Sequence, residues 1–282
     1  MATLKMTLQS VTPQRTRSQN WLCQRRRFAA KVAWSFPIVN IASAIFDRSA
    51  PDLASCPDES LPEFAFIGRS NVGKSSLLNM LAGERDLARV SATPGFTKLI
   101  NMFTMNKTWR LVDLPGYGFA QAAKKTKAKF NAAVAEYLEE RPNLCCVFAL
   151  IDSSLPPQPI DLEFVEWLIN SAVPFVLVFT KTDTVKPEAV QANIAAFTEC
   201  IAEWCENLPE IYTCSAKENQ GRWELLGVID AAITEFQAPK PSVSTDVVLE
   251  EESLPKPWII PPRRDSEGGA APGNRSKIAR PW

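Results

Sequence analysis

The sequence predicts a three-layer α/β fold in which helices cover both faces of a mostly parallel central sheet. Short apolar runs alternate with amphipathic helical stretches between residues 64 and 236. This alternation is typical of parallel sheets that are wrapped by helices on both sides. Two of the runs, residues 144–151 and 174–179, are apolar almost throughout. Such continuity is expected of strands that are buried on both faces.

The elements follow from these patterns in chain order. The predicted strands are residues 64–67, 99–105, 108–112, 144–151, 174–179 and 211–214. The predicted helices are residues 74–81, 131–140, 161–171, 187–204 and 223–236. We expect the second and third strands to form a hairpin around Asn106 and Lys107, because a short polar turn separates two strand-like runs there.

Charge and proline are distributed unevenly along the 282 residues, although 31 basic and 31 acidic side chains balance overall. Residues 1–46 carry seven basic and no acidic residues, and residues 237–282 carry eight of the 22 prolines. Neither end shows a sustained apolar period, so we expect a disordered basic leader, a folded domain over residues 47–236 and a disordered Pro-rich tail. The folded part has 17 basic and 25 acidic residues, a net charge of −8.

The leader has two interpretations. An acid-free, Arg-bearing N-terminus is typical of a transit peptide, which would place the protein in the plastid stroma or the mitochondrial matrix. The alternative is a variable N-terminus on a protein of the bacterial cytoplasm. Both stay open at this stage.

The composition excludes several kinds of site. The chain has no His, which excludes His metal ligands and a His general base. Its seven Cys include no CxxC pair, so we expect free thiols in a reducing compartment. Cys145 and Cys146 are adjacent, and a regular strand would point them to opposite faces. No apolar stretch approaches the ~20 residues that span a bilayer, so no membrane association is expected.

The strongest motif is GRSNVGKS at residues 68–75, a full GxxxxGK[ST] between a predicted strand and a predicted helix. Its glycines let the backbone curl, so that N–H groups converge on phosphate oxygens beside a helix N-terminus. Lys74 is expected to bridge the β- and γ-phosphates, and Ser75 to ligate Mg²⁺. The motif therefore predicts a nucleoside triphosphate site.

A second segment, Asp113-Leu-Pro-Gly, ends the predicted strand at residues 108–112. Its carboxylate can hold Mg²⁺ through water, and the Gly116 N–H can meet the γ-phosphate. Alone this segment is only a turn. It gains weight because ligands of open parallel sheets bind at the carboxyl ends of the strands.

Two further segments predict contacts with the base of the nucleotide. In Thr180-Lys-Thr-Asp, Asp183 can accept two hydrogen bonds from guanine, and the Lys181 stem can cover the base plane. Adenine lacks this donor pair and would leave the carboxylate unpaired. After the last predicted strand, Ser215 and Ala216 can brace Asp183 and offer a backbone N–H to the guanine carbonyl.

Over residues 38–236 the chain resembles the EngB (YihA/YsxC) family of TrmE-Era-EngA-EngB-septin-like GTPases. The resemblance is carried by SAPDL (49–53), LPEFAFIGRSNVGKSSLLN (61–79), TPGFTKLIN (93–101), WRLVDLPGYGFA (109–120), DLEFVEWL (161–168), FVLVFTKTD (175–183) and TCSAKENQGR (213–222). It implies a P-loop GTPase fold with GTP or GDP as ligand and Mg²⁺ as cofactor.

The resemblance also assigns roles to residues. It implies that Thr97 ligates Mg²⁺ in the GTP state, beside Ser75 and Asp113. Asn71 either holds a K⁺ ion next to the phosphates or only stabilises the turn, and with Lys74 and Thr97 it completes the catalytic set. The nucleotide-contacting residues implied in this way are Gly68, Arg69, Ser70, Asn71, Val72, Gly73, Lys74, Ser75, Ser76, Gly95, Phe96, Thr97, Lys98, Leu99, Asp113, Leu114, Pro115, Gly116, Thr180, Lys181, Thr182, Asp183, Thr213, Cys214, Ser215 and Ala216.

The function implied is a GTP-operated switch in assembly of the large ribosomal subunit, linked to cell division and septation. Tyr117 stands where Ras-like GTPases carry a water-orienting Gln, so slow hydrolysis is expected. The partner would be the subunit or its rRNA precursor. Candidate RNA contacts are Lys124, Lys125, Lys127, Lys129, Arg263, Arg264, Arg275, Lys277 and Arg280, although a run of Lys on a helix is commonly a solvated face.

Two other classes of protein fit the sequence less well than the switch. A P-loop nucleotide kinase requires an acceptor pocket and a lid, and it has no use for a guanine-reading aspartate. A septin-like scaffold predicts long helical stalks or heptads, which the sequence lacks. We therefore expect a monomeric switch protein.

Overall fold

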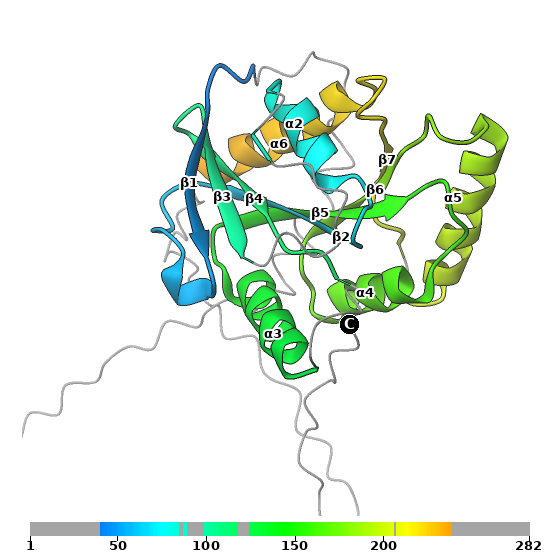
Figure 1. Ribbon diagram of the computed structural model, residues 1–282, viewed down its shortest axis with the longest axis horizontal. Coiled ribbons are helices and arrows are strands. Elements are labelled where there is room, and N and C mark those ends of the chain that lie inside the picture. Colours follow the sequence, from blue (N-terminus) through cyan, green and yellow to red (C-terminus); the bar gives the residue numbers. More distant parts are fainter. Residues whose placement is uncertain (1–39, 85–86, 89–98, 118–123, 206, 239–282) are drawn as a thin grey trace, which may run out of the picture. The chain divides into compact units, whose positions relative to one another are not determined.

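The computed structural model describes residues 40–84, 87–88, 99–117, 124–205 and 207–238. A seven-stranded sheet in the order β1-β3-β4-β2-β5-β6-β7 forms its centre (Figure 1). The strands are β1 (Ala44–Ala50), β2 (Glu63–Gly68), β3 (Ile100–Met105), β4 (Trp109–Asp113), β5 (Leu144–Asp152), β6 (Phe175–Thr180) and β7 (Ile211–Thr213). Pairing is parallel from β4 to β7, and β3 is antiparallel to both β1 and β4. The predicted fold class is confirmed.

Helices cover both faces of this sheet (Figure 1). They are α2 (Lys74–Ala82), α3 (Lys124–Glu140), α4 (Pro159–Asn170), α5 (Pro187–Ala202) and α6 (Arg222–Gln237), with a short 3-10 turn η1 (Leu53–Ser55). Residues of α2 and α6 share one buried cluster, and residues of α3, α4 and α5 share another. Helix α3 begins at Lys124 and not at residue 131, because its first residues, KKTKAKF, contain too few apolar side chains to show a helical period.

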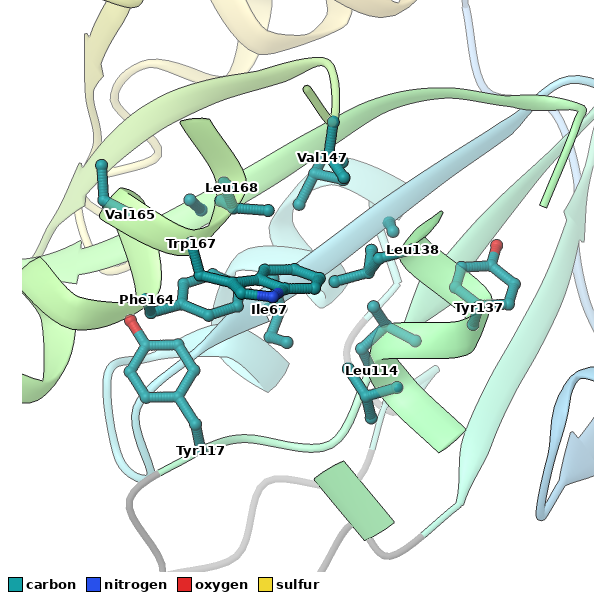
Figure 2. Close-up of a cluster of buried hydrophobic side chains, with 14 of the residues drawn as sticks. Ile67, Leu114, Tyr117, Tyr137, Leu138, Val147, Phe164, Val165, Trp167 and Leu168 are labelled. Carbon is teal, nitrogen blue, oxygen red and sulfur yellow. The ribbon is translucent and has the colours of Figure 1, made fainter. Parts of the chain in front are cut away.

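Successive strand residues serve opposite faces, which explains why the central strands are apolar throughout. In β2, Phe64 and Phe66 join the cluster under α2 and α6, whereas Ala65 and Ile67 join the other cluster. Phe66 stacks on Phe148 of β5 at 4.5 Å between ring centroids. Figure 2 shows the second cluster, where side chains of α3 and α4 pack over Ile67 and Val147.

Strand β1 was not predicted. Its sequence, AIFDRSA, lacks a regular period of two, and its register on β3 shifts between Phe46 and Arg48. As an edge strand it pairs only with β3, and Ile45 and Phe46 stay more than half exposed. A strand with one partner and little burial leaves a weak hydrophobic signal in the sequence.

The predicted hairpin between β3 and β4 is confirmed. Asn106 and Lys107 both have positive φ, 51° and 59°, as tight hairpin turns require. The Asn106 side chain also accepts from the Ala42 N–H at 2.8 Å and donates to the Asn40 carbonyl at 2.7 Å. The turn therefore holds the chain that leads into β1.

The expectation that Cys145 and Cys146 face opposite ways is wrong. Both pack against the cluster under α2 and α6, because the register of β5 on β2 shifts between Leu144 and Cys146. The described cysteines are free thiols, and burial raises the pKa of Cys145 to about 12. In the described ranges, no helix has the length and apolarity needed to span a membrane.

A buried ionic cluster stabilises the amino ends of β2 and β4, which lie opposite to the strand ends that carry the predicted site. Glu63, fully buried at the start of β2, accepts from the Tyr137 hydroxyl at 2.7 Å and from the Arg141 guanidinium at 2.7 and 2.9 Å. Arg110 of β4 lies 3.4 Å from the same carboxylate and donates to the Asp58 carbonyl at 2.6 Å. Buried charges that are fully paired hold their surroundings in one arrangement, but removing one partner leaves the others uncompensated.

Replacing Glu63 with Gln should therefore lower the free energy of unfolding by about 3 kcal/mol, because Arg110 and Arg141 would lose their buried counter-charge. Denaturant titration measures the loss. The matched control is Glu59→Gln, which removes an exposed carboxylate 3.6 Å from Arg141 and should change stability by less than about 1 kcal/mol. Equal stability of the two variants would contradict this role of Glu63.

Candidate nucleotide-binding site

Four chemistry-bearing segments follow the carboxyl ends of four strands. The GxxxxGK[ST] loop follows β2, Asp113 ends β4, Thr180 ends β6 and the segment at 213–217 follows β7. Because β4, β2, β5, β6 and β7 are consecutive and parallel, these segments line one edge of the sheet. The segments that the sequence predicts to bind a ligand therefore share one edge, and their binding of a ligand stays a prediction.

The loop after β2 is curled by two residues with left-handed backbone. Asn71 has φ of 66°, and Gly73, which caps α2, has φ of 99°. Gly68 makes a close approach, since a Cβ there would lie 2.7 Å from the Leu150 carbonyl. Lys74 then begins α2, so the loop presents backbone N–H groups at a helix N-terminus, which favours phosphate.

Lys74 and Asp113 form a buried ion pair between this loop and the end of β4. The Lys74 ammonium donates to Asp113 Oδ1, and the Asn101 amide of β3 lies 3.5 Å from Oδ2. Asp113 is 3% exposed, so the neighbouring cation compensates a carboxylate that burial would otherwise penalise. This pair brings the β4 carboxylate next to Lys74, the residue that precedes Ser75.

The segment after Asp113 lies directly against the loop. A Cβ on Gly116 would come within 2.8 Å of the Gly68 carbonyl, so only glycine fits there without a shift. Next to it, the Tyr117 N–H donates to the Gly68 carbonyl at 3.2 Å, and the Ser70 N–H donates to the Tyr117 carbonyl at 3.4 Å. The backbone of this segment is therefore joined to that of the loop after β2.

Thr180 ties the base-side segment to the same loop. Its hydroxyl donates to the Val72 carbonyl at 2.6 Å and lies 3.2 Å from the Ile151 carbonyl. The next residue, Lys181, has φ of 60°, and its methylenes lie 3.9 Å from where a Cβ on Gly73 would stand. The segment that follows β6 is thus fixed to the loop that follows β2.

Asp152 is a site residue that sequence reasoning missed. It ends β5, is buried, and accepts from the Lys181 ammonium at 2.7 Å and from the Ser154 N–H and hydroxyl at 3.0 and 2.6 Å. Burial opposes its ionisation, but these hydrogen bonds lower its pKa below the ordinary value. The sequence does carry a signal for Asp152: its carboxylate comes directly after an apolar predicted strand, as that of Asp113 does.

Asp183 is held by the segment that follows β7. The Ser215 hydroxyl donates to Asp183 Oδ1 at 2.6 Å, and Lys217 Nζ lies 3.9 Å from Oδ2. The Ser215 hydrogen bond lowers the pKa of Asp183, so the side chain is an anion at neutral pH. Backbone also joins the two segments, since the Thr182 N–H donates to the Cys214 carbonyl at 3.3 Å.

The remaining predicted residues divide into two groups. Gly95, Phe96, Thr97 and Lys98 lie outside the described residues, and Leu99 is partly exposed just before β3. The others occupy the segments already described: Arg69, Ser70, Ser76, Leu114, Pro115, Thr213, Cys214 and Ala216. The described residues contain no group of three or more Cys, Asp or Glu suited to a metal ion, so the predicted Mg²⁺ site depends on hydroxyls and Asp113.

Comparison with known proteins supports a nucleotide site. A family model described as "50S ribosome-binding GTPase" matches residues 63–181. The chain is 47% identical over 193 residues to a probable GTP-binding protein EngB of Christiangramia forsetii, covering 68% of this chain and 97% of that protein. It is 45% identical over 200 residues to one of Bacteroides fragilis, covering 71% and 100%.

Among solved structures, a crystal structure of a probable GTP-binding protein EngB aligns with a TM-score of 0.48 and 24% identity. The alignment covers 61% of this chain and 99% of that one. The identity and coverage of the two bacterial relatives, and not this alignment, establish the family. The chain belongs to the EngB family of GTP-binding proteins.

Proposed function

We propose that this protein is a GTP-operated switch that hydrolyses GTP slowly with Mg²⁺ and acts in assembly of the large ribosomal subunit, with a link to cell division and septation. The observation that carries the proposal is the hydrogen bond from the Thr180 hydroxyl to the Val72 carbonyl. It fixes the base-reading segment next to the phosphate loop. One nucleotide can then contact both at once.

Guanine recognition is supported by the surroundings of Asp183. The carboxylate is an anion that is only 12% exposed, and Ser215 holds one of its oxygens in place. An oriented acceptor matches the N1–H and amino donors of guanine and penalises adenine, which lacks them. A P-loop nucleotide kinase would gain nothing from this arrangement.

Replacing Asp183 with Asn should weaken GDP binding by about 100-fold and improve binding of xanthosine diphosphate, because the amide exchanges an acceptor for a donor. Calorimetric or fluorescence titration with both nucleotides measures the change. The matched control is Glu218→Gln in the same segment, whose side chain is exposed and whose substitution should leave both affinities within about twofold. Unchanged GDP affinity in Asp183→Asn would count against the proposed reading of the base.

The site residues also fit Mg²⁺, a hard cation that prefers oxygen ligands and retains waters. Ser75 in the first turn of α2 and Asp113 at the end of β4 would hold it, with Thr97 as a third ligand that lies outside the described residues. The ion would neutralise charge on the β- and γ-phosphates. Lys74 contributes a second cation from the same loop.

Slow hydrolysis is supported by the position of Tyr117. Its side chain is 3% exposed and packs on Phe164, so it does not extend toward the phosphates to orient water. Asn71 either stabilises the turn or holds a K⁺ ion. Its left-handed backbone suits a turn, and its exposed side chain is available to the ion. Comparing hydrolysis rates in K⁺ and Na⁺ separates the two.

The ribosomal role is supported by the matched family model, which is described as a 50S ribosome-binding GTPase. Helix α3 contains the Lys run at 124–129, and six residues separate it from the segment at 113–117 that contacts the phosphate loop. A partner bound there could respond to the nucleotide, with strongly salt-dependent affinity. Placement in the bacterial cytoplasm, or in an organelle if residues 1–46 are a transit peptide, stays a prediction.

Co-sedimentation with large ribosomal subunits tests the switch. Binding should be at least about tenfold stronger with a non-hydrolysable GTP analogue than with GDP, because only a triphosphate can order both switch segments. The wild-type protein with GDP is the internal control, and a salt series checks the ionic part of binding. Equal sedimentation in both states would contradict switching while leaving the nucleotide site intact.

A further inference from the structure

The function proposed above makes no use of Asp161 or of the polar contacts in a buried cluster beside the site. The cluster, here called the Arg69 cluster, consists of Arg69 in the phosphate loop, Tyr117 after the segment at 113–116, and Asp161 in the first turn of α4. Asp161 is 1% exposed and Tyr117 is 3% exposed. The three side chains come from separate segments. They therefore link both phosphate-facing segments to one helix.

Tyr117 is fixed by its backbone and by its ring. Its N–H and carbonyl pair with Gly68 and Ser70 of the phosphate loop. Its ring packs on Phe164 of α4 at 4.5 Å between centroids, and Phe164 in turn stacks on Trp167 (Figure 2). Tyr117 therefore connects the backbone next to Gly116 with the surface of α4.

The polar atoms of the cluster face one another without completing their bonds. Arg69 Nε lies 3.6 Å from Asp161 Oδ2, an ion pair longer than a hydrogen bond. Within the described part of the chain, Arg69 Nε, Asp161 Oδ1 and the Tyr117 hydroxyl are buried without a hydrogen-bond partner. Burial raises the pKa of Tyr117 well above its ordinary value, as do the Asp161 charge and the approach of the hydroxyl to the Asp161 carboxyl, an approach that falls short of good hydrogen-bond geometry. The phenol therefore keeps its proton and is a donor.

A buried network that is only partly satisfied is costly, and a small movement that completes it is favourable. The donor on Tyr117 and the acceptor on Asp161 are complementary. Since Tyr117 directly follows Gly116, closing this bond would fix the Gly116 N–H relative to the phosphate loop. A diphosphate makes no use of that N–H, whereas a triphosphate does.

We propose that Asp161 is a positioning residue for the triphosphate state: it receives the Tyr117 hydroxyl and the Arg69 guanidinium, and thereby holds Gly116 where it meets the γ-phosphate. This inference rests on the proposed function. It adds that α4 distinguishes GTP from GDP through the Arg69 cluster. A ligand shifts the equilibrium between two conformations only if it binds them with different affinity. A role of Asp161 in the triphosphate state must therefore be seen as a change in the ratio of the affinities for GTP and GDP.

The test measures dissociation constants of the full chain for GDP and for a non-hydrolysable GTP analogue. In Tyr117→Phe and in Asp161→Asn, the preference for the analogue over GDP should fall about tenfold, with GDP affinity within about twofold of wild type. The double variant should lose no more than the larger single effect, because both substitutions break one interaction. Tyr117→Phe keeps the ring on Phe164, so its nucleotide preference alone tests the inference if Asp161→Asn does not fold.

Tyr137→Phe is the matched control. Its hydroxyl also donates to a buried carboxylate held by an arginine, Glu63 with Arg141, but at the opposite edge of the sheet. It should lower stability and leave the nucleotide preference unchanged. An unchanged preference in Tyr117→Phe would overturn the inference alone, even if stability falls. A wild-type chain that binds neither guanine nucleotide would overturn the proposed function and the inference with it.

Discussion

The hydrogen bond between the Thr180 hydroxyl and the Val72 carbonyl is the constraint on which the site depends. The phosphate loop follows β2 and the base-reading segment follows β6, with β5 between them in the sheet. Parallel pairing brings their ends to one edge, but only to within two strand spacings, about 10 Å. The Thr180 hydroxyl closes that gap at the level of the backbone. Lys181 extends the contact, with its stem beside Gly73 and its ammonium on Asp152. This connection is the basis of the proposal that a single nucleotide is recognised at its base and at its phosphates.

Buried charged side chains are concentrated at both the amino and the carboxyl ends of the central strands, and the two groups have different roles. At the amino ends of β2 and β4, Glu63 is fully paired with Arg110, Arg141 and Tyr137, which suits a structural role. At the carboxyl ends, the ion pair of Lys74 with Asp113 stands where ligands bind, and the Arg69 cluster is incompletely hydrogen-bonded. Arg110 Nε is also buried without a hydrogen-bond partner, so the two groups differ at their carboxylates: both oxygens of Glu63 accept hydrogen bonds, whereas Asp161 Oδ1 accepts none. A carboxylate that is held at both oxygens favours one arrangement of its surroundings.

Much of this fold could be predicted from local patterns, because the central strands are buried on both faces and the hairpin turn has a clear polar signature. The segments after β2, β4, β6 and β7 could be found because each carries polar residues directly after an apolar strand. Strand β1 could not, since an edge strand with a register shift shows little periodicity. The contacts of Asp152, Asp161 and Thr180 could not be predicted either, because they join segments far apart in sequence and depend on strand order. The order itself is fixed by tertiary pairing, which no local pattern encodes.

Direct titration of the full-length protein with GDP and with ADP tests the central claim, that one site reads a guanine base and its phosphates together. One GDP should bind per chain, and ADP should bind about a thousandfold more weakly, because adenine would leave the Asp183 carboxylate unpaired. Binding of ADP within about tenfold of GDP would contradict it. The same result would show that Ser215 and Asp183 do not select the base.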